Sequence, residues 1–407
     1  MREPATGTGG ARRIALFTNK MDAGGVQRAL VSLACEFVAR GHAVELLLVR
    51  ARGEMLAQLP AEVRVREFSA RWPFAARPLF DLPGEARKLA PGFVATMLPR
   101  ALRSLGPLSE YLKSEPPDAV LATPMTCALT ALWAAELAHS PVRIVAREAN
   151  TLSQQIAQRR LLFIKHLPAL ARDWYPRAAG IVAVSDGVAD DLAKLTGLAR
   201  ERIVTIHNPL DVARIRKLAA AEPDEPWLRD SSGPPVILAA GRLARAKDFP
   251  MLLRAFALVR AHREARLVIL GRGPEWLRLA ALVRRLGIAR DVRLAGYVPN
   301  PFAAMARARV FALSSRYEGL ANVLREALAC GCTVVATDCP SGSSEVLRGG
   351  ALGRLVPVGD AQAMAEALLA ALGETPSAET IRTRVESVSG GDPAARYLEL
   401  LLGSSRC

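Results

Sequence analysis

Short apolar segments alternate with segments of helical periodicity along most of this chain of 407 residues. Residues 13–18 form an apolar run, a glycine turn follows at Gly24 and Gly25, and residues 26–39 carry apolar side chains at intervals of three and four. Gly41 ends this helix, and residues 43–49 supply the next strand. Strand, helix and strand in this order make a β-α-β unit, and its repetition predicts parallel sheets with helices on both faces.

The alternation occurs in two series. Strands of the first series are expected at residues 13–18, 43–49, 63–68, 119–122, 143–146, 180–184 and 203–206. Strands of the second series are expected at residues 236–240, 267–270, 292–294, 310–313 and 333–337. Residues 219–235 between them are rich in Ala, Pro, Asp, Ser and Gly, which indicates a linker, and residues 392–402 predict a tail helix. The chain is therefore expected to be an α/β protein with two doubly wound, Rossmann-like domains.

Two cations follow the first strand of the second series. Arg242 comes directly after the glycine turn at Gly241, and Lys247 follows five residues later. Arginine offers a planar fork that matches phosphate oxygens, lysine adds a compact charge, and the helix expected to begin near Phe249 adds a partial positive charge. Because ligands bind beyond the carboxyl ends of strands in open parallel sheets, this pattern predicts a phosphate site. Two solvated cations beside a loop would give the same pattern.

Two glutamates eight residues apart, Glu318 and Glu326, follow a later strand of the same series. The segment from Gly319 to Asn322 is typical of a loop that enters a helix, with Asn322 as its N-cap. Backbone N–H groups at such a position can donate to sugar hydroxyls or phosphate. Glu326 would then lie on the first helical turn, where it could accept from ribose hydroxyls. A solvated helix face would carry the same spacing.

The composition limits the classes of partner. The formal net charge is +15, which suits an anionic partner but also arises from an Arg-rich genomic composition. Aromatic residues make up only 5 %, which argues against a nucleic-acid stacking platform. Residues 71–113 and 159–177 combine cations with Phe, Trp and Leu, so each could lie on an anionic membrane surface or pack on its own sheet. No partnership with nucleic acid is expected.

Cysteines and apolar runs indicate the compartment. The six cysteines are too sparse for a disulfide framework. Cys330, Cys332 and Cys339 lie close together, but no histidine is nearby and their spacing matches no common zinc pattern. Residues 1–11 lack an apolar signal core, and no stretch of 18 apolar residues occurs. We expect no metal, no cofactor and a cytoplasmic protein, and a peripheral contact with the cytoplasmic face of the inner membrane is one of the two interpretations of the basic stretches.

The motifs in their order resemble the retaining family 4 glycosyltransferases, which have the GT-B fold. The resemblance rests on Gly-Arg-Leu with Lys247 and Asp248, on Leu-Gly-Arg-Gly-Pro from Leu270, and on Ser-Arg-Tyr-Glu-Gly-Leu-Ala-Asn-Val from Ser315. The run Gly-Cys-Thr-Val-Val-Ala-Thr-Asp-Cys-Pro-Ser-Gly, the N-terminal Gly-Gly-Val-Gln-Arg and the Asn-Pro-Leu-Asp turn fit the same family. It covers nearly the whole chain and is strongest for bacterial enzymes of lipopolysaccharide core or lipid-linked polysaccharide synthesis.

This resemblance implies two Rossmann-like domains that face a central cleft. Residues 1–212 would form the N-terminal acceptor-binding domain, and residues 213–390 the nucleotide-sugar donor domain. Residues 391–407 would form a helix that crosses back to the N-terminal domain.

The resemblance also assigns roles at the donor site. Glu318, Arg242 and Lys247 would be the catalytic residues, with the two cations binding the donor diphosphate. Glu318 and the amides of Gly319 and Leu320 would position the transferred sugar.

The resemblance also implies residues at the ribose, the phosphates and the base of the donor, and at the acceptor. Glu326 would hold the ribose, Asn322 would lie at the donor, Gly25 would let the N-terminal loop approach the phosphates, and Gly296 and Tyr297 would line the base pocket. On the acceptor side, many relatives carry a histidine where this chain has Val-Ala-Arg-Glu-Ala-Asn, so Gly24, Glu148 and Asn150 are the candidates there.

The implied reaction moves a hexosyl or N-acetylhexosaminyl group from a UDP-sugar to a hydroxyl of a lipid-linked or lipopolysaccharide glycan, with retention and without a metal. A donor phosphate oxygen would accept the proton of the acceptor hydroxyl. Two alternatives stay open, a nucleotide-sugar-binding GT-B protein with epimerase-like chemistry and one without turnover.

Overall fold

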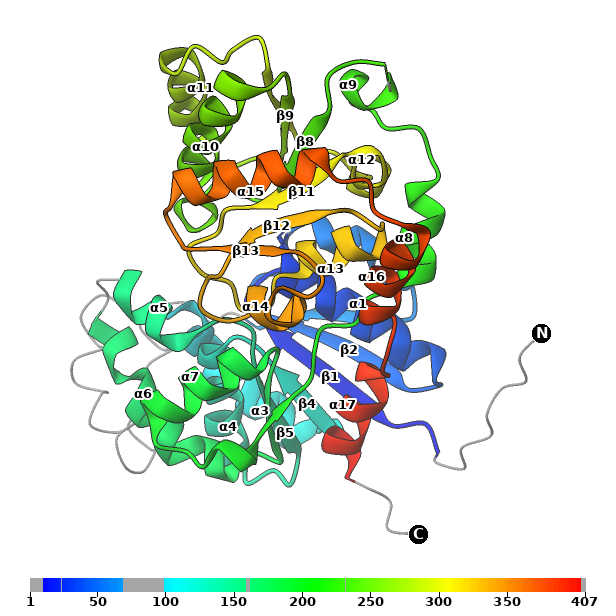
Figure 1. The fold of residues 1–407 in the computed structure, drawn as a ribbon. Helices are drawn as coiled ribbons and strands as arrows, with labels where there is room; N and C mark the ends of the chain where they lie inside the picture. Colours follow the sequence, from blue (N-terminus) through cyan, green and yellow to red (C-terminus); the bar gives the residue numbers. More distant parts are fainter. Residues whose placement is uncertain (1–9, 23, 69–98, 159–161, 231, 404–407) are drawn as a thin grey trace. The chain divides into compact units, whose positions relative to one another are not determined.

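The computed structural model describes residues 10–22, 24–68, 99–158, 162–230 and 232–403 (Figure 1). The chain divides into two compact units. Unit 1 comprises Met1–Val184, Val188–Pro209 and Asp392–Cys407, and unit 2 comprises Ser185–Gly187 and Leu210–Gly391.

Unit 1 is built on a seven-stranded sheet in the order β3-β2-β1-β4-β5-β6-β7, and every neighbouring pair is parallel. Its strands are β1 (Arg13–Thr18), β2 (Ala43–Leu48), β3 (Arg64–Glu67), β4 (Ala119–Ala122), β5 (Arg143–Glu148), β6 (Gly180–Ala183) and β7 (Ile203–Thr205). The central strands are almost continuously apolar because helices cover both faces of the sheet.

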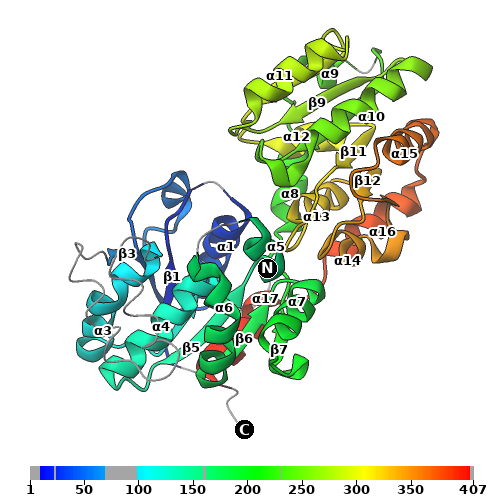
Figure 2. The same cartoon turned by 90° about the vertical axis from the view of Figure 1, so that its left-hand side faces the viewer.

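One face of this sheet is covered by α1 (Gly25–Ala39) and α17 (Pro393–Leu402), which share a core with the strands. From the other face, α4 (Met125–Ala138) packs on β1, β4 and β5, with α3 (Leu105–Ser114) and α6 (Leu162–Trp174) beside it (Figure 2). Among the described residues, this part of the chain also contains α5 (Leu152–Gln158) and α7 (Asp186–Thr196).

The tail helix α17 is fastened to the strands of unit 1 by polar contacts. Tyr397 is fully buried, and its hydroxyl accepts a hydrogen bond from Nε of Arg147 at 3.0 Å. Arg147 also donates from Nη2 to Oδ1 of Asn208 at 2.5 Å. Nε of Arg143 donates to the carbonyl oxygen of Leu401 at 2.9 Å. The last helix of the chain is therefore part of the core of unit 1.

Unit 2 is built on a six-stranded parallel sheet in the order β10-β9-β8-β11-β12-β13. Its strands are β8 (Val236–Ala240), β9 (Arg266–Leu270), β10 (Val292–Gly296), β11 (Val310–Leu313), β12 (Val334–Thr337) and β13 (Arg354–Val356). The core on one face joins α10 (Phe249–His262), α11 (Trp276–Arg285) and α15 (Ala361–Gly373).

The other helices of unit 2 contact one another and the same sheet. α12 (Pro301–Arg307) contacts β8, α13 (Asn322–Ala329) contacts β12, and α8 (Val212–Ala219) packs on both helices. Three further helices are α9 (Pro226–Arg229), α14 (Ser343–Val346) and α16 (Ala378–Val388).

The two parallel-sheet units confirm the predicted α/β fold class. The secondary structure differs from the sequence prediction in the following elements. β13 was not expected, because only Val356 of its three residues is buried. The expected linker contains the short helix α9, which begins where the carboxylate of Glu225 accepts from the amide of Trp227. The N-cap of α13 is Ala321, without a side-chain hydrogen bond, so the assignment of Asn322 as the cap is wrong.

The structure describes the two basic stretches, residues 71–113 and 159–177, to different extents. Most of the first, including Trp72, Phe74 and Phe80, lies outside the described residues. In the second, Ile164, Leu167, Leu170 and Trp174 of α6 are buried, and the ring centroid of Trp174 lies 6.1 Å from that of Trp133 in α4. This burial favours packing within unit 1, against α4, for α6. Among the described residues, no helix combines the length and the apolar character that a membrane span requires.

Replacing Tyr397 by alanine tests how strongly the tail helix stabilises unit 1. The substitution removes a fully buried ring and leaves Nε of Arg147 without its acceptor. We expect the free energy of unfolding in urea to fall by about 3–5 kcal/mol. Glu399→Ala, on the exposed side of the same helix, is the matched control and should change it by less than about 0.5 kcal/mol. Equal effects of the two substitutions would contradict the account.

Candidate functional site

Two glycine turns at the carboxyl edge of the sheet in unit 2 lie directly against each other. The amide of Gly241, after β8, donates to the carbonyl oxygen of Leu270 at 2.9 Å. A Cβ atom on Gly271 would lie 1.9 Å from the carbonyl oxygen of Gly241, and one on Gly273 would lie 2.3 Å from that of Leu243. No side chain fits at either position, so these glycines are required for the approach of the two turns.

Lys247 lies over the first of these turns. It ends a short 3₁₀ helix, Arg245–Lys247, and its Cε lies 3.2 Å from where a Cβ on Gly241 would be. Its Nζ lies 2.5 Å from Oε1 of Glu318, and the two side chains are 19 % and 13 % exposed. The structure thus brings together an ammonium and a carboxylate that are 71 residues apart in the chain.

Further hydrogen bonds fasten the segment around Lys247 to the segment after β11. Oγ of Ser315 donates to the same Oε1 of Glu318 at 2.6 Å, and Oγ of Ser314 donates to the carbonyl oxygen of Lys247 at 2.7 Å. Nε of Arg316 donates to Oδ2 of Asp248 at 2.7 Å. The sequence analysis gave no role to Ser314, Ser315 or Arg316, although hydroxyls directly after an apolar strand could have indicated the two serines.

The loop between Glu318 and α13 lies in close contact with another glycine turn, at Gly342. Gly319 and Leu320 are buried, and Gly342 has φ +100°. A Cβ on Gly342 would lie 3.0 Å from the amide nitrogen of Ala321 and 3.4 Å from the carbonyl oxygen of Gly319. The backbone that precedes α13 is therefore held close to the turn at Gly342.

Glu326 lies deeper than the sequence suggested. It is the fifth residue of α13, on the second helical turn, and is 5 % exposed. Its neighbour Arg325 is also buried, and burial lowers the pKa of Arg325 to about 10, against the opposing charges of Glu326 and Glu345. The expectation of a first-turn position for Glu326 is wrong.

Three other residues expected at the donor lie in the loop after β8 and at the end of β10. Arg242 is exposed, in the same loop as Lys247. Gly296 ends β10 with φ +77°, and its carbonyl oxygen accepts from the amide of Gly271 at 2.6 Å. Tyr297 is 47 % exposed, and the guanidinium of Arg272 lies 5.9 Å from its ring centroid. Loops after β8, β9 and β10 thus meet at one edge.

The candidates in unit 1 lie at the carboxyl edge of its own sheet. Gly24 precedes α1 in an extended conformation without a side-chain cap, and Gly25 and Asn150 are exposed. Glu148 is instead buried, and its carboxylate accepts a hydrogen bond from the hydroxyl of Tyr175. Burial raises the pKa of Glu148 to about 7, partly offset by Tyr175 and the charge of Arg147. This placement disagrees with the expected sugar contact, because the carboxylate is turned into the core.

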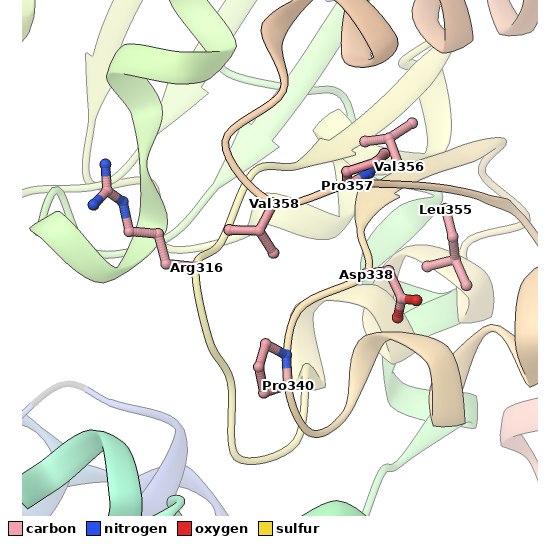
Figure 3. Close-up of a pocket in the computed structure, with 7 residues that line it drawn as sticks. All are labelled: Arg316, Asp338, Pro340, Leu355, Val356, Pro357 and Val358. Atoms are coloured by element: carbon pink, nitrogen blue, oxygen red, sulfur yellow. The ribbon is translucent and has the colours of Figure 1, made fainter. Parts of the chain in front are cut away.

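A pocket of about 720 Å³ lies at the carboxyl ends of β11, β12 and β13 in unit 2 (Figure 3). Its lining residues are Arg316, Asp338, Pro340, Leu355, Val356, Pro357 and Val358. The side chains of Arg316 and Asp338 point away from each other in Figure 3. Arg316 belongs to the same segment as Glu318, so the pocket adjoins that segment. The sequence did not predict the pocket, because it did not predict β13, which supplies part of the lining.

Comparison with known families matches both units. The model described as Glycosyl transferases group 1 matches residues 234–374, and the model described as Glycosyltransferase Family 4 matches residues 23–214. Together these matches cover the sheet of unit 2 and all strands of the sheet of unit 1 except β1.

Curated relatives align with part of the chain. The N-acetylgalactosamine-N,N'-diacetylbacillosaminyl-diphospho-undecaprenol 4-alpha-N-acetylgalactosaminyltransferase of Campylobacter jejuni is 33 % identical over 236 residues, which is 58 % of this chain and 61 % of the relative. A lipopolysaccharide core biosynthesis glycosyltransferase of Rhizobium meliloti is 33 % identical over 188 residues, which is 46 % of this chain and 52 % of the relative. The chain therefore spans between half and two thirds of the length of these two relatives.

Solved structures share the fold over nearly the full length. The crystal structure of Anabaena HepE in complex with UDP and glucose superposes with a TM-score of 0.68 at 18 % identity, over 96 % of this chain and 95 % of that one. At this identity the likeness shows the fold alone.

The buried carboxyl of Glu148 predicts a pH dependence of stability. Its pKa is raised from 4.5 to about 7 in the folded protein, so the folded state holds the proton more tightly than the unfolded state. The resulting stabilisation is present below about pH 4.5 and is lost as the pH rises toward 7. Between pH 5 and pH 8, the wild type should lose about 2–3 kcal/mol more unfolding free energy than Glu148→Gln in urea titrations. Parallel pH profiles for the two proteins would show that the carboxyl titrates normally.

Proposed function

Since the chain belongs to the family 4 glycosyltransferases of GT-B fold, we propose that it is a retaining glycosyltransferase that uses a UDP-sugar. The acceptor would be a hydroxyl of a lipid-linked or lipopolysaccharide glycan. The transferred group would be a hexosyl or N-acetylhexosaminyl group.

One observation carries this proposal, the placement of Lys247 beside Glu318 at the carboxyl edge of the sheet in unit 2. A nucleotide-sugar presents a diphosphate, which needs cations, and sugar hydroxyls, which need acceptors. An ammonium and a carboxylate 2.5 Å apart can serve both parts of one donor molecule. Arg242 in the same loop would add a second cation.

The proposed roles follow from charge and position. Negative charge develops on the diphosphate as the bond to the sugar breaks, and Lys247 and Arg242 would stabilise that charge without reorganisation. Glu318 and the amides of Gly319 and Leu320 would orient the sugar. A donor phosphate oxygen would take the proton of the acceptor hydroxyl, and no metal would be required.

The outer parts of the donor would meet other loops of unit 2. Glu326 and Asn322 would lie on the ribose side, and Gly296 and Tyr297 on the side of the base. On unit 1, Gly24, Gly25 and Asn150 would serve the phosphates and the acceptor, while Glu148 would hold the end of β5 through Tyr175.

The names of similar proteins support the choice of substrates. The Campylobacter relative is named for transfer of N-acetylgalactosamine to a diphospho-undecaprenol-linked sugar, and HepE was solved with UDP and glucose. UDP-hexoses and UDP-N-acetylhexosamines are therefore the donors to test first, with polyprenyl-diphosphate-linked saccharides as acceptors.

The deciding experiment incubates the protein with each of these donors in the presence of EDTA and measures release of UDP, with and without acceptor. We expect release with one donor class and, with acceptor, a product whose anomeric configuration by NMR equals that of the donor. Inversion would contradict retention, and loss of activity with EDTA would contradict metal independence. Accumulation of a free epimerised sugar would favour the epimerase-like alternative, and binding without release would favour the protein without turnover.

Lys247→Ala tests the central cation. Loss of a donor to the developing charge should lower kcat by about 10²–10³-fold at saturating donor. Arg245→Ala is the matched control, because Arg245 lies in the same short helix with a side chain that is 86 % exposed. The control should keep kcat within about twofold of the wild type. Full turnover by Lys247→Ala would refute the assigned role.

The basic charge supports a further proposal, that the protein lies peripherally on an anionic inner membrane. Lys165 and Arg172 are exposed on α6, while Ile164, Leu167 and Leu170 are buried, so the contact would be electrostatic. Sedimentation with phosphatidylglycerol vesicles should decrease strongly between about 50 mM and 500 mM salt. Lys165→Glu combined with Arg172→Glu should weaken binding at low salt. Absence of binding at low salt would contradict this proposal and favour genomic composition as the origin of the net positive charge.

A further inference from the structure

The carboxylate of Glu318 is held at one oxygen only. Oε1 accepts from Nζ of Lys247 at 2.5 Å and from Oγ of Ser315 at 2.6 Å. Among the residues that the structure describes, no hydrogen bond has Oε2 of Glu318 as its acceptor. The carboxylate is thus fixed at one side and keeps acceptor capacity on the other.

Ser315 is itself rigidly placed. It is fully buried two residues after the end of β11, and Oγ1 of Thr337, the last residue of β12, donates to its carbonyl oxygen at 2.6 Å. A hydroxyl that donates to an ionised carboxylate forms a stronger hydrogen bond than one between neutral groups. The sheet therefore sets the position of the hydroxyl, and the hydroxyl sets the position of Oε1.

The adjacent serine makes a different kind of contact. Oγ of Ser314 donates to the backbone carbonyl of Lys247 and so fastens one loop to another. Oγ of Ser315 donates to the side chain that faces the donor sugar in the proposed function. The two hydroxyls thus act on different parts of the site, although both lie at the end of the same strand.

We propose that Ser315 is a positioning residue, whose hydroxyl orients the Glu318 carboxylate so that Oε2 accepts from the hydroxyls of the donor sugar. This inference rests on the proposed function and gives a role to a residue of the motif to which the family resemblance assigned none. Without the hydroxyl, Oε1 keeps Lys247 alone, and the carboxylate can turn about its terminal torsion, which has broad minima. Lys247 would still bind the diphosphate, so the loss falls on the sugar.

The test compares binding of UDP with turnover of the UDP-sugar. Ser315→Ala should lower kcat/KM for the active donor by about ten- to a hundredfold, mainly through kcat, while the Kd for UDP stays within about twofold. Ser315→Thr keeps a hydroxyl and should recover kcat/KM to within about threefold of the wild type. Thr196→Val is the control for loss of a buried hydroxyl elsewhere, since Oγ1 of Thr196 donates to the carbonyl of Leu192 in α7. The control should keep kcat/KM, whatever its effect on the melting temperature.

A double-mutant cycle shows whether Ser315 acts through Glu318. In a Glu318→Ala background, Ser315→Ala should change the donor kcat/KM, or the Kd for the UDP-sugar, by less than about twofold. Additive effects, or an equal fall in UDP affinity, would overturn the assignment of Ser315, as would wild-type kcat/KM in Ser315→Ala. A wild type that turns over no nucleotide-sugar would overturn the proposed function and the positioning role with it, so the two failures are distinguishable.

Discussion

An ion pair between Lys247 and Glu318 joins the loops that follow two neighbouring strands, β8 and β11, and the geometry of the site depends on it. Both side chains are largely withdrawn from water, which costs desolvation energy that a close contact and extra hydrogen bonds must offset. Ser315 supplies one such bond. Because a buried ion pair contributes little net stability, its presence here is better understood as preparation for a ligand. A donor would bring phosphate charge to the lysine and hydroxyls to the glutamate, and so replace part of the pair.

The scaffold around this pair is set by close backbone approaches. Gly271 and Gly273 let the turn after β9 lie directly on the turn after β8, and Gly342 lets another loop support the backbone before α13. These contacts leave little freedom to the backbone that carries Lys247. They fit a site that is formed before the ligand arrives, which is what electrostatic stabilisation of a developing charge requires.

The sequence predicted the elements that alternate strongly in hydropathy and missed those that depend on distant partners. β1 and β8 begin and end at the predicted residues, because an apolar run bounded by turns has one interpretation in a parallel sheet. β13 has only three residues, of which one is buried, and the cap of α13 at Ala321 carries no polar side chain, so neither gave a local pattern. The buried carboxylate of Glu148 accepts from Tyr175, which is 27 residues away in the chain. No pattern near Glu148 in the sequence predicts that partner. Ser315, by contrast, lies only three residues from Glu318, and a hydroxyl directly after an apolar strand was a local sign that the sequence prediction did not use.

The most direct test of the central claim is a structure of this protein with UDP bound. The account predicts a phosphate oxygen within about 3 Å of Nζ of Lys247, in place of part of the contact of Lys247 with Glu318. UDP bound away from the carboxyl ends of β8 and β11, with the Lys247–Glu318 pair unchanged, would contradict it.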